Sequence, residues 1–182
     1  MRKEIEVKAR VRDPQQVMTK LKELGITFSD PTTQSDVTFV DSDYGAYQDF
    51  HPGKNILRIR KQGGQCLFTV KQPQKNELDN IEHETEILNP VEFREALLLM
   101  GYREAVKIHK TRRKAKFQDL EICLDEVSGL GTYIEVEKIT EIESADQVQA
   151  ELFSFLEKLG VSASDQETHG YDTLVYLKKV GQ

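Results

Sequence analysis

The segment Met1-Arg-Lys-Glu-Ile-Glu-Val-Lys-Ala-Arg10 alternates charged and apolar side chains with a period of two. Successive side chains of a β-strand point to opposite faces, so the segment predicts a strand with Glu4, Glu6 and Lys8 on one face. The other face is apolar and carries Ile5, Val7 and Ala9. A solvated charged face is the alternative when this strand is considered alone, since antiparallel sheets usually face water on one side.

The alternation recurs in further segments, with both signs of charge. These segments are residues 55–60, 67–71, 81–88, 107–116, 120–124 and 133–138. Arg58 and Arg60 share a face of the first, whereas Glu135 and Glu137 share a face of the last. The sequence Gln62-Gly-Gly-Gln65 predicts a two-residue hairpin turn, because glycine accepts the positive φ angles that such turns require.

Four segments have helical spacing of apolar residues and could cover the apolar face of a sheet. Asp13-Pro14 and Asn89-Pro90 each provide a capping residue followed by proline, and these helices would end near Gly25 and Gly101. The other two are expected over residues 144–160 and about 170–179. With the apolar face covered, the charged face lines either solvent or an enclosed space. Closure into a barrel would produce a tunnel and remove exposed edges.

A charged tunnel places limits on what it contains. Two cations on alternate residues of a strand, about 6–7 Å apart, repel by roughly 2–3 kcal/mol at an effective dielectric constant of about 20. Magnesium is commonly bound by one or two carboxylates together with substrate phosphates. Arginine suits phosphate because its guanidinium donates two hydrogen bonds at once. Separate groups of glutamates and of basic residues therefore indicate a divalent cation and a polyanion, such as a linear triphosphate.

With these residues in view, the chain resembles the CYTH superfamily, the triphosphate tunnel metalloenzymes. The resemblance rests on the E-x-E-x-K pattern of Glu4 to Lys8, on the order of the arginines and lysines, and on Asp125-Glu-Val-Ser-Gly-Leu-Gly-Thr-Tyr-Ile-Glu135. The last segment, with its Gly-Leu-Gly turn, is similar to the class IV adenylate cyclase branch. The resemblance extends from residue 3 to the C-terminal helix.

The resemblance implies an α+β fold in which an eight-stranded antiparallel β-barrel forms a charged tunnel flanked by helices, as one domain over residues 1–182. It implies one or two Mg²⁺ or Mn²⁺ ions held by Glu4, Glu6, Asp125, Glu135 and Glu137. The residues expected to bind phosphate are Lys8, Arg58, Arg60, Lys71, Lys110 and Arg112. Glu4, Glu6, Lys8 and Lys71 are expected to be catalytic. The roles of Glu84, Glu86 and Lys114 stay open, as does the choice between metal ligand and structural partner for Glu137.

The same tunnel would serve two reactions, because phosphoryl transfer depends mainly on positioning and on stabilising charge on phosphate oxygens. The first expectation is a class IV-like adenylate cyclase that converts ATP to cyclic AMP and pyrophosphate. The alternative is a thiamine or inorganic triphosphatase acting on thiamine triphosphate or tripolyphosphate and releasing orthophosphate. A non-catalytic triphosphate-binding module is the second alternative, although anion binding alone would be hindered by so many carboxylates.

Composition restricts the partners and the compartment. The net charge of −6 argues against nucleic acid, since proteins that follow phosphate backbones usually carry a strongly basic surface. Charges begin at Arg2 and no long apolar run follows, so neither a signal peptide nor a membrane segment is expected, and a cytoplasmic location is predicted. Cys66 and Cys123 are expected to be reduced thiols. A homodimer would be in keeping with the resemblance.

Several residues have structural explanations. The four histidines lack metal-ligand spacing and are expected to be solvated or structural. Tyr171 is expected to pack in the core. The irregular stretch from Asp41 to Lys54 would either contact substrate or form a disordered surface loop.

Overall fold

An antiparallel barrel closes on itself in the computed structural model, which describes residues 3–141 and 144–181. The strands are β1 (Lys3–Arg10), β2 (Thr32–Asp41), β3 (Ile56–Gln62), β4 (Gln65–Pro73), β5 (Asp79–Glu86), β6 (Tyr102–Phe117), β7 (Leu120–Val127) and β8 (Gly131–Thr140). Their order around the barrel is β5-β4-β3-β2-β6-β7-β8-β1, and a β5–β1 pairing closes it. The predicted eight-stranded antiparallel barrel is confirmed.

The closing strand β1 contacts two different partners along one edge. Lys3, Glu4 and Ile5 pair with β5, whereas Lys8 and Ala9 pair with the short strand β9 (Gln166–Glu167). The other edge of β1 pairs with β8 along its whole described length. Met1 and Arg2, which the expected N-terminal strand included, lie outside the described residues.

The four expected helices are present as α1 (Pro14–Glu23), α2 (Pro90–Leu99), α3 (Ala145–Lys158) and α4 (Tyr171–Val180). The Asp13 and Asn89 side chains accept hydrogen bonds from the amides of Gln16 and Glu92, so both predicted caps form. A 3₁₀ turn (Ala163–Asp165) precedes β9. None of these helices, within the part of the chain that the structure describes, is long and apolar enough to cross a bilayer.

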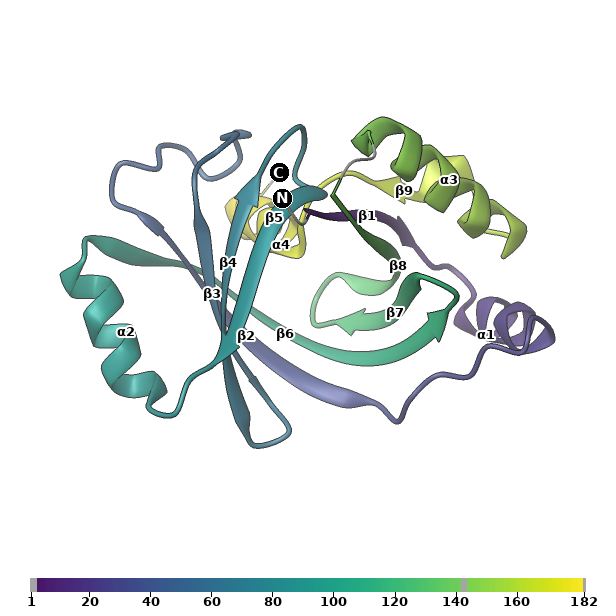
Figure 1. The fold of residues 1–182 in the computed structure, drawn as a ribbon, viewed down its shortest axis with the longest axis horizontal. Helices are drawn as coiled ribbons and strands as arrows, with labels where there is room; N and C mark the ends of the chain where they lie inside the picture. Colours follow the sequence, from purple (N-terminus) through teal and green to yellow (C-terminus); the bar gives the residue numbers. More distant parts are fainter. Residues whose placement is uncertain (1–2, 142–143, 182) are drawn as a thin grey trace.

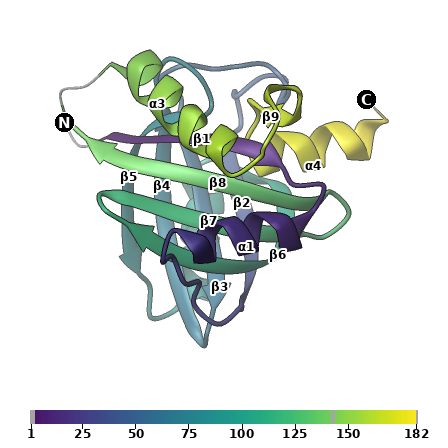
Figure 2. The same ribbon diagram turned by 90° about the vertical axis from the view of Figure 1, so that its right-hand side faces the viewer.

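The main hydrophobic core lies outside the barrel, not within it. Helices α1 and α3 lie across the outer face of β1, β7 and β8 (Figures 1 and 2). Ile5, Val7 and Ala9 point into this layer and pack with Leu21 of α1 and Leu156 of α3. On the opposite side, α2 packs against β3. Because strand side chains alternate, the charged residues of β1 must point into the barrel.

One strand of the barrel was absent from the sequence expectations. Strand β2 pairs with β3 and β6, and its side chains Gln34, Asp36 and Thr38 are buried. Its alternation is weak at the sequence level, because Thr32 to Ser35 is polar throughout. A shift in register against β6 between Val37 and Phe39 also interrupts the pairing.

The β3–β4 hairpin forms as predicted. Gly63 and Gly64 have φ angles of 53° and 84°, which residues with a Cβ atom rarely adopt. The turn fixes the register of the two strands and thereby places Arg58 opposite Thr69 and Arg60 opposite Leu67.

Replacement of Leu156 by Ala tests the external core. Leu156 has no exposed surface, so removal of its side chain should lower the free energy of unfolding by about 2–5 kcal/mol. Urea unfolding measures this change. The neighbouring exposed residue provides the control, since Glu157→Ala should alter stability by less than about 0.5 kcal/mol. Equal effects of the two substitutions would show that α3 does not pack on the barrel as described.

Candidate functional site

The barrel encloses a cavity of about 520 Å³, a size typical of small-molecule sites. All eight barrel strands and the first turn of α4 contribute to its wall. The six residues expected to bind phosphate all line it: Lys8, Arg58, Arg60, Lys71, Lys110 and Arg112. Of the five expected metal ligands, Glu4, Glu6, Glu135 and Glu137 line the cavity and Asp125 does not.

Arg60 is held by a residue that lies directly across the sheet. Its Nε and Nη2 donate to the two carboxylate oxygens of Asp36 at 2.8 and 2.7 Å. Burial would raise the pKa of Asp36, but the hydrogen bonds and charge of Arg60 outweigh it and the pKa is lowered. Asp36 therefore remains a carboxylate and orients the guanidinium.

Asp125 holds two other cations, Arg112 and Lys110, as Asp36 holds Arg60. Arg112 lies opposite it and donates from Nε to Oδ1 at 2.7 Å and from Nη2 to Oδ2 at 2.5 Å. Lys110 Nζ donates to the same Oδ2 at 2.9 Å. Asp125 has no exposed surface, and both of its oxygens are engaged by cations. Burial, followed by the charge of Arg112, lowers the pKa of Lys110 to about 8.

Lys8 lies among acceptors at one end of the cavity. Its Nζ donates to the carbonyl oxygen of His169 at 3.0 Å and lies 3.3 Å from Glu135 and 3.7 Å from Glu6. Burial would lower the pKa of Lys8, but Glu135 and Glu6 overcome this and raise it. Glu135 also pairs with Arg112. Lys8 is thus a fully charged ammonium with 1% of its surface exposed.

The third part of the wall is formed by β3, β4 and β5. Lys71 Nζ lies 2.6 Å from Glu82, directly across the sheet, and 3.6 Å from Glu4. Arg58 lies 3.3 Å from Glu82 and 3.4 Å from Glu84. Burial would raise the pKa of Glu82, but Lys71 and Arg58 lower it to about 2. Of the two glutamates whose roles were open, Glu84 pairs with Arg58, whereas Glu86 is exposed at the end of β5.

Three carboxylates form a row across neighbouring strands and have a different environment. Glu137 of β8 lies opposite Glu6 of β1 on one side and opposite Glu121 of β7 on the other. Like charges directly opposite one another destabilise a sheet. Burial and then Glu135 raise the pKa of Glu6 to about 7, and burial, Glu4 and Glu121 raise that of Glu137 to about 9. Among the described residues, Glu137 alone of the three has no cationic partner, since Glu6 lies 3.7 Å from Lys8 and Glu121 pairs with Lys114.

Glu6 and Glu137 of this row, together with Glu4, form a group whose geometry fits a divalent cation. One oxygen each of Glu4, Glu6 and Glu137 lie within 4.8 Å of one another. A hard divalent metal takes oxygen ligands, and it would relieve the repulsion that raises the pKa values of Glu6 and Glu137. Among the described residues, the groups with metal-binding geometry contain no histidine.

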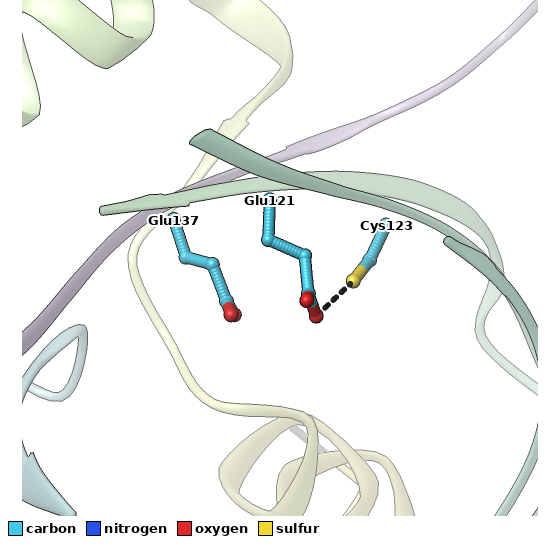
Figure 3. Close-up of side chains that lie close together, drawn as sticks. All are labelled: Glu121, Cys123 and Glu137. Atoms are coloured by element: carbon cyan, nitrogen blue, oxygen red, sulfur yellow. Dashed lines mark hydrogen bonds between the residues drawn. The ribbon is translucent and has the colours of Figure 1, made fainter. Parts of the chain in front are cut away.

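A second group shares Glu137 and includes a thiol. The side chains of Glu121, Cys123 and Glu137 point the same way from neighbouring strands (Figure 3), and one ligand atom of each lies within 4.8 Å of the others. Cys123 Sγ lies 3.8 Å from Glu121. Burial raises the pKa of Cys123, which keeps it a neutral thiol. Glu121 also pairs with Lys114. Lys114, whose role the sequence left open, therefore helps to orient Glu121. Cys66 and Cys123 are free thiols, as expected.

The stretch from Asp41 to Lys54 is a packed part of the cavity wall. Tyr44 and Tyr47 are 3% and 6% exposed, and their rings lie 5.8 Å apart. Tyr47 lines the cavity and its hydroxyl donates to Asp172 of α4 at 2.7 Å. Phe50 and His51 also line the cavity. The stretch is therefore ordered in the wall and not a disordered surface loop, and its contact with substrate stays a prediction.

Sequence patterns missed several residues of the wall. Asp36 was missed with its strand, although the alternation of Asp36 and Thr38 with Val37 and Phe39 could have revealed it. Glu82 lies in the segment 81–88, whose alternation predicted a charged strand, but nothing in the sequence indicated its pairing with Lys71. Tyr171 packs in a core cluster, as expected. It also lines the cavity, and no periodic pattern in the sequence predicted this.

The sequence and the fold are similar to those of known proteins. The model of the CYTH domain matches residues 2–171. A Methanocaldococcus jannaschii protein named "putative adenylate cyclase" is 32% identical over 162 residues, which cover 87% of this chain and 90% of that protein. The solved structure of a Pyrococcus horikoshii protein is 28% identical, with a TM-score of 0.78, and the match covers 96% of this chain and 99% of that one.

A more distant structure shares the fold. It comes from Hippeastrum, is 20% identical with a TM-score of 0.57, and the match covers 93% of this chain and 91% of that chain. That protein is described as a "putative adenylyl cyclase" with a dominant triphosphatase activity. One fold thus carries both descriptions.

Metal binding should be coupled to proton release at the carboxylate row. Because the pKa values of Glu6 and Glu137 are raised to about 7 and about 9, a cation must displace protons at neutral pH. The affinity for Mg²⁺ should therefore increase as pH rises from about 6 to 9. Calorimetric titration in two buffers with different ionisation enthalpies counts the protons released.

The variant Glu137→Gln provides the comparison, because it keeps the size of the side chain and cannot release a proton. It should bind Mg²⁺ more weakly and with fewer protons released. An affinity for Mg²⁺ that is constant from pH 6 to 9 in the natural sequence would contradict this electrostatic account.

Proposed function

Because this chain belongs to the CYTH domain family, we propose that it is a metal-dependent enzyme acting on a triphosphate substrate inside its tunnel. We propose further that it is a class IV-like adenylate cyclase that converts ATP to cyclic AMP and pyrophosphate. The observation that carries the proposal is the division of the tunnel wall into a group of three carboxylates with metal-ligand geometry, Glu4, Glu6 and Glu137, and a set of oriented arginines and lysines.

In this proposal the two sets of side chains have different tasks. Glu4, Glu6 and Glu137 would hold Mg²⁺ or Mn²⁺, and the bound ion would neutralise charge on the phosphate oxygens. Asp125 and Glu135 are predicted metal ligands whose contacts here are with Arg112, Lys110 and Lys8. In this state their contribution is to keep those cations charged and oriented.

The basic residues would hold the triphosphate in an extended form. Arg60 and Arg112 are fixed by Asp36 and Asp125, so their guanidinium groups lose little freedom when phosphate binds. Lys8 and Lys71 are the predicted catalytic cations, and neighbouring carboxylates raise the pKa of each above its ordinary value. Both therefore stay positively charged and would stabilise negative charge on the phosphate oxygens during the reaction.

The bond changes of the cyclase reaction place specific demands on the tunnel. The ribose 3′ oxygen attacks the α-phosphorus, the bond from that phosphorus to the oxygen bridging to the β-phosphate breaks, and pyrophosphate leaves. The hydroxyl proton passes to a base or to solvent. Attack and departure must be in line, and this requires the ribose to fold back while the β- and γ-phosphates stay bound.

The choice of cyclase first is supported by the Methanocaldococcus jannaschii relative and by the segment from Asp125 to Glu135 with its Gly-Leu-Gly turn. A thiamine or inorganic triphosphatase is the second candidate. It is favoured by the activity described for the Hippeastrum protein, which has the same fold. In that reaction water would attack the terminal phosphorus and orthophosphate would be released.

Phosphorus NMR of the purified protein distinguishes these functions. ATP and tripolyphosphate are supplied separately, each with Mg²⁺ and then with Mn²⁺. Cyclic AMP with pyrophosphate from ATP is the result that the proposal predicts. Orthophosphate from either substrate would assign the protein as a triphosphatase. Tight binding without any product would contradict an enzymatic role and leave a triphosphate-binding module.

Replacement of Glu6 by Gln should reduce metal-dependent turnover at least about 100-fold, because a lost metal ligand removes several kcal/mol of charge stabilisation. The side chain keeps its size and its surroundings, so the melting temperature of the metal-free protein should not fall. The matched control is Glu86→Gln, on an exposed part of β5, which should keep full activity. Normal turnover in Glu6→Gln would show that Glu6 does not hold the metal.

A further inference from the structure

Aromatic and apolar side chains gather at one end of the tunnel. This end is where the stretch from Asp41 to Lys54 enters β3, away from the β3–β4 hairpin turn. Ile56 begins β3 and Pro73 ends β4, and the amide of Gly53 donates to the Pro73 carbonyl oxygen at 2.7 Å. The aromatic and apolar residues of the cavity wall here are Tyr44, Tyr47, Phe50, His51, Ile56 and Pro73.

Phe50 differs from the two tyrosines at this end of the tunnel. Tyr44 and Tyr47 are buried and pack in a core cluster, whereas Phe50 is 40% exposed and belongs to none of the three core clusters formed by the described residues. A single exposed apolar residue is ordinary on a protein surface. Phe50, however, lies on the wall of the cavity, where a bound molecule can cover its exposed surface.

The backbone on both sides of Phe50 is held by one turn. The Asp49 amide donates to the Ala46 carbonyl oxygen at 3.2 Å, and His51 Nε2 lies 2.9 Å from the same oxygen. The His51 ring packs edge-on against Tyr44, with the ring centres 4.6 Å apart. Phe50 therefore lies between two anchored neighbours, and little backbone freedom is lost when a ligand covers its ring.

The apolar end continues into the cationic part of the wall along β3. Ile56, Arg58 and Arg60 all line the cavity. They are alternate residues of one strand, so each is about 6–7 Å from the next. Lys71 lies directly opposite Ile56 on β4. A molecule whose phosphates contact Arg58 and Lys71 can therefore extend its other end toward Ile56 and Phe50.

We propose that Phe50 is a specificity residue, whose ring stacks on the planar base of a nucleoside triphosphate bound in the tunnel. The inference rests on the proposed function and deepens it, because it assigns the substrate to triphosphates that carry an aromatic heterocycle. Every base has a π-face, and stacking on an aromatic side chain needs no hydrogen-bond partner. The charged wall binds the phosphates, and Phe50 recognises the group attached to them.

Two ligands that differ only in the nucleoside test this role. ATP and tripolyphosphate are each used with both bridging oxygens of the triphosphate replaced by methylene groups, so that neither is cleaved. Calorimetry with Mg²⁺ measures their affinities. Phe50→Ala should bind the ATP analogue about 5- to 100-fold more weakly, the range expected for loss of one stacking ring. Its affinity for the tripolyphosphate analogue should stay within twofold of that of the natural protein.

Two further variants separate stacking from a disturbance of the stretch. Phe50→Tyr keeps the ring and should bind the ATP analogue within twofold of the natural protein. Gln48→Ala is the matched control, because Gln48 is exposed in the same stretch and is absent from the cavity wall that the described residues form. It should leave both affinities unchanged. The melting temperature of Phe50→Ala should stay close to that of the natural protein, since Phe50 belongs to no core cluster of the described residues.

Three results would overturn the inference and leave the proposed function intact. Equal losses for both analogues in Phe50→Ala would show that the substitution disturbs the phosphate site. Unchanged affinities would show that the base lies elsewhere. Thiamine triphosphate also carries planar rings, and if it bound more tightly than the ATP analogue in competition, the stacking surface would belong to thiamine and not to a nucleotide. Failure of the natural protein to bind either analogue would instead contradict the proposed function itself, so the two failures are distinguishable.

Discussion

Compensation of buried charge across neighbouring strands is the constraint on which this structure depends. A barrel that turns its charged face inward must place lysines and arginines in a partly desolvated space, where an unpaired charge is costly. The register meets this requirement directly: Arg60 lies opposite Asp36, Arg112 opposite Asp125, and Lys8 opposite Glu135. The external helices then bury the apolar face of the same strands. One alternation of side chains therefore produces both the core and the site.

Glu137, at the centre of the carboxylate row, departs from this rule, and the departure supports the proposed metal site. Glu137 lies between Glu6 and Glu121, and burial together with neighbouring carboxylates raises its pKa to about 9. A protein built only for stability would gain from a cation or an apolar residue at this position. In the proposed function a divalent cation would relieve this repulsion, and the paired cations nearby would bind the phosphates that accompany it.

The sequence predicted the parts of the molecule that depend on local periodicity. Alternation in β1, β3 and β8 assigned residues to the inner and outer faces, and proline after a capping residue located α1 and α2. Partner identity could not be read in this way, because it depends on which strands are neighbours and in what register. The weakly alternating strand β2 and its Asp36 were missed for this reason. Tyr171 reaches the tunnel only because α4 folds back onto the barrel from the far end of the chain.

The most direct test of the account is a crystal structure with Mn²⁺ and tripolyphosphate, using anomalous scattering to locate the metal. The account predicts an anomalous peak coordinated by Glu4, Glu6 and Glu137, with the phosphates contacting Arg60 and Arg112 while their pairs with Asp36 and Asp125 persist. A metal bound elsewhere, or tripolyphosphate on the outer surface with the carboxylate row unoccupied, would contradict it.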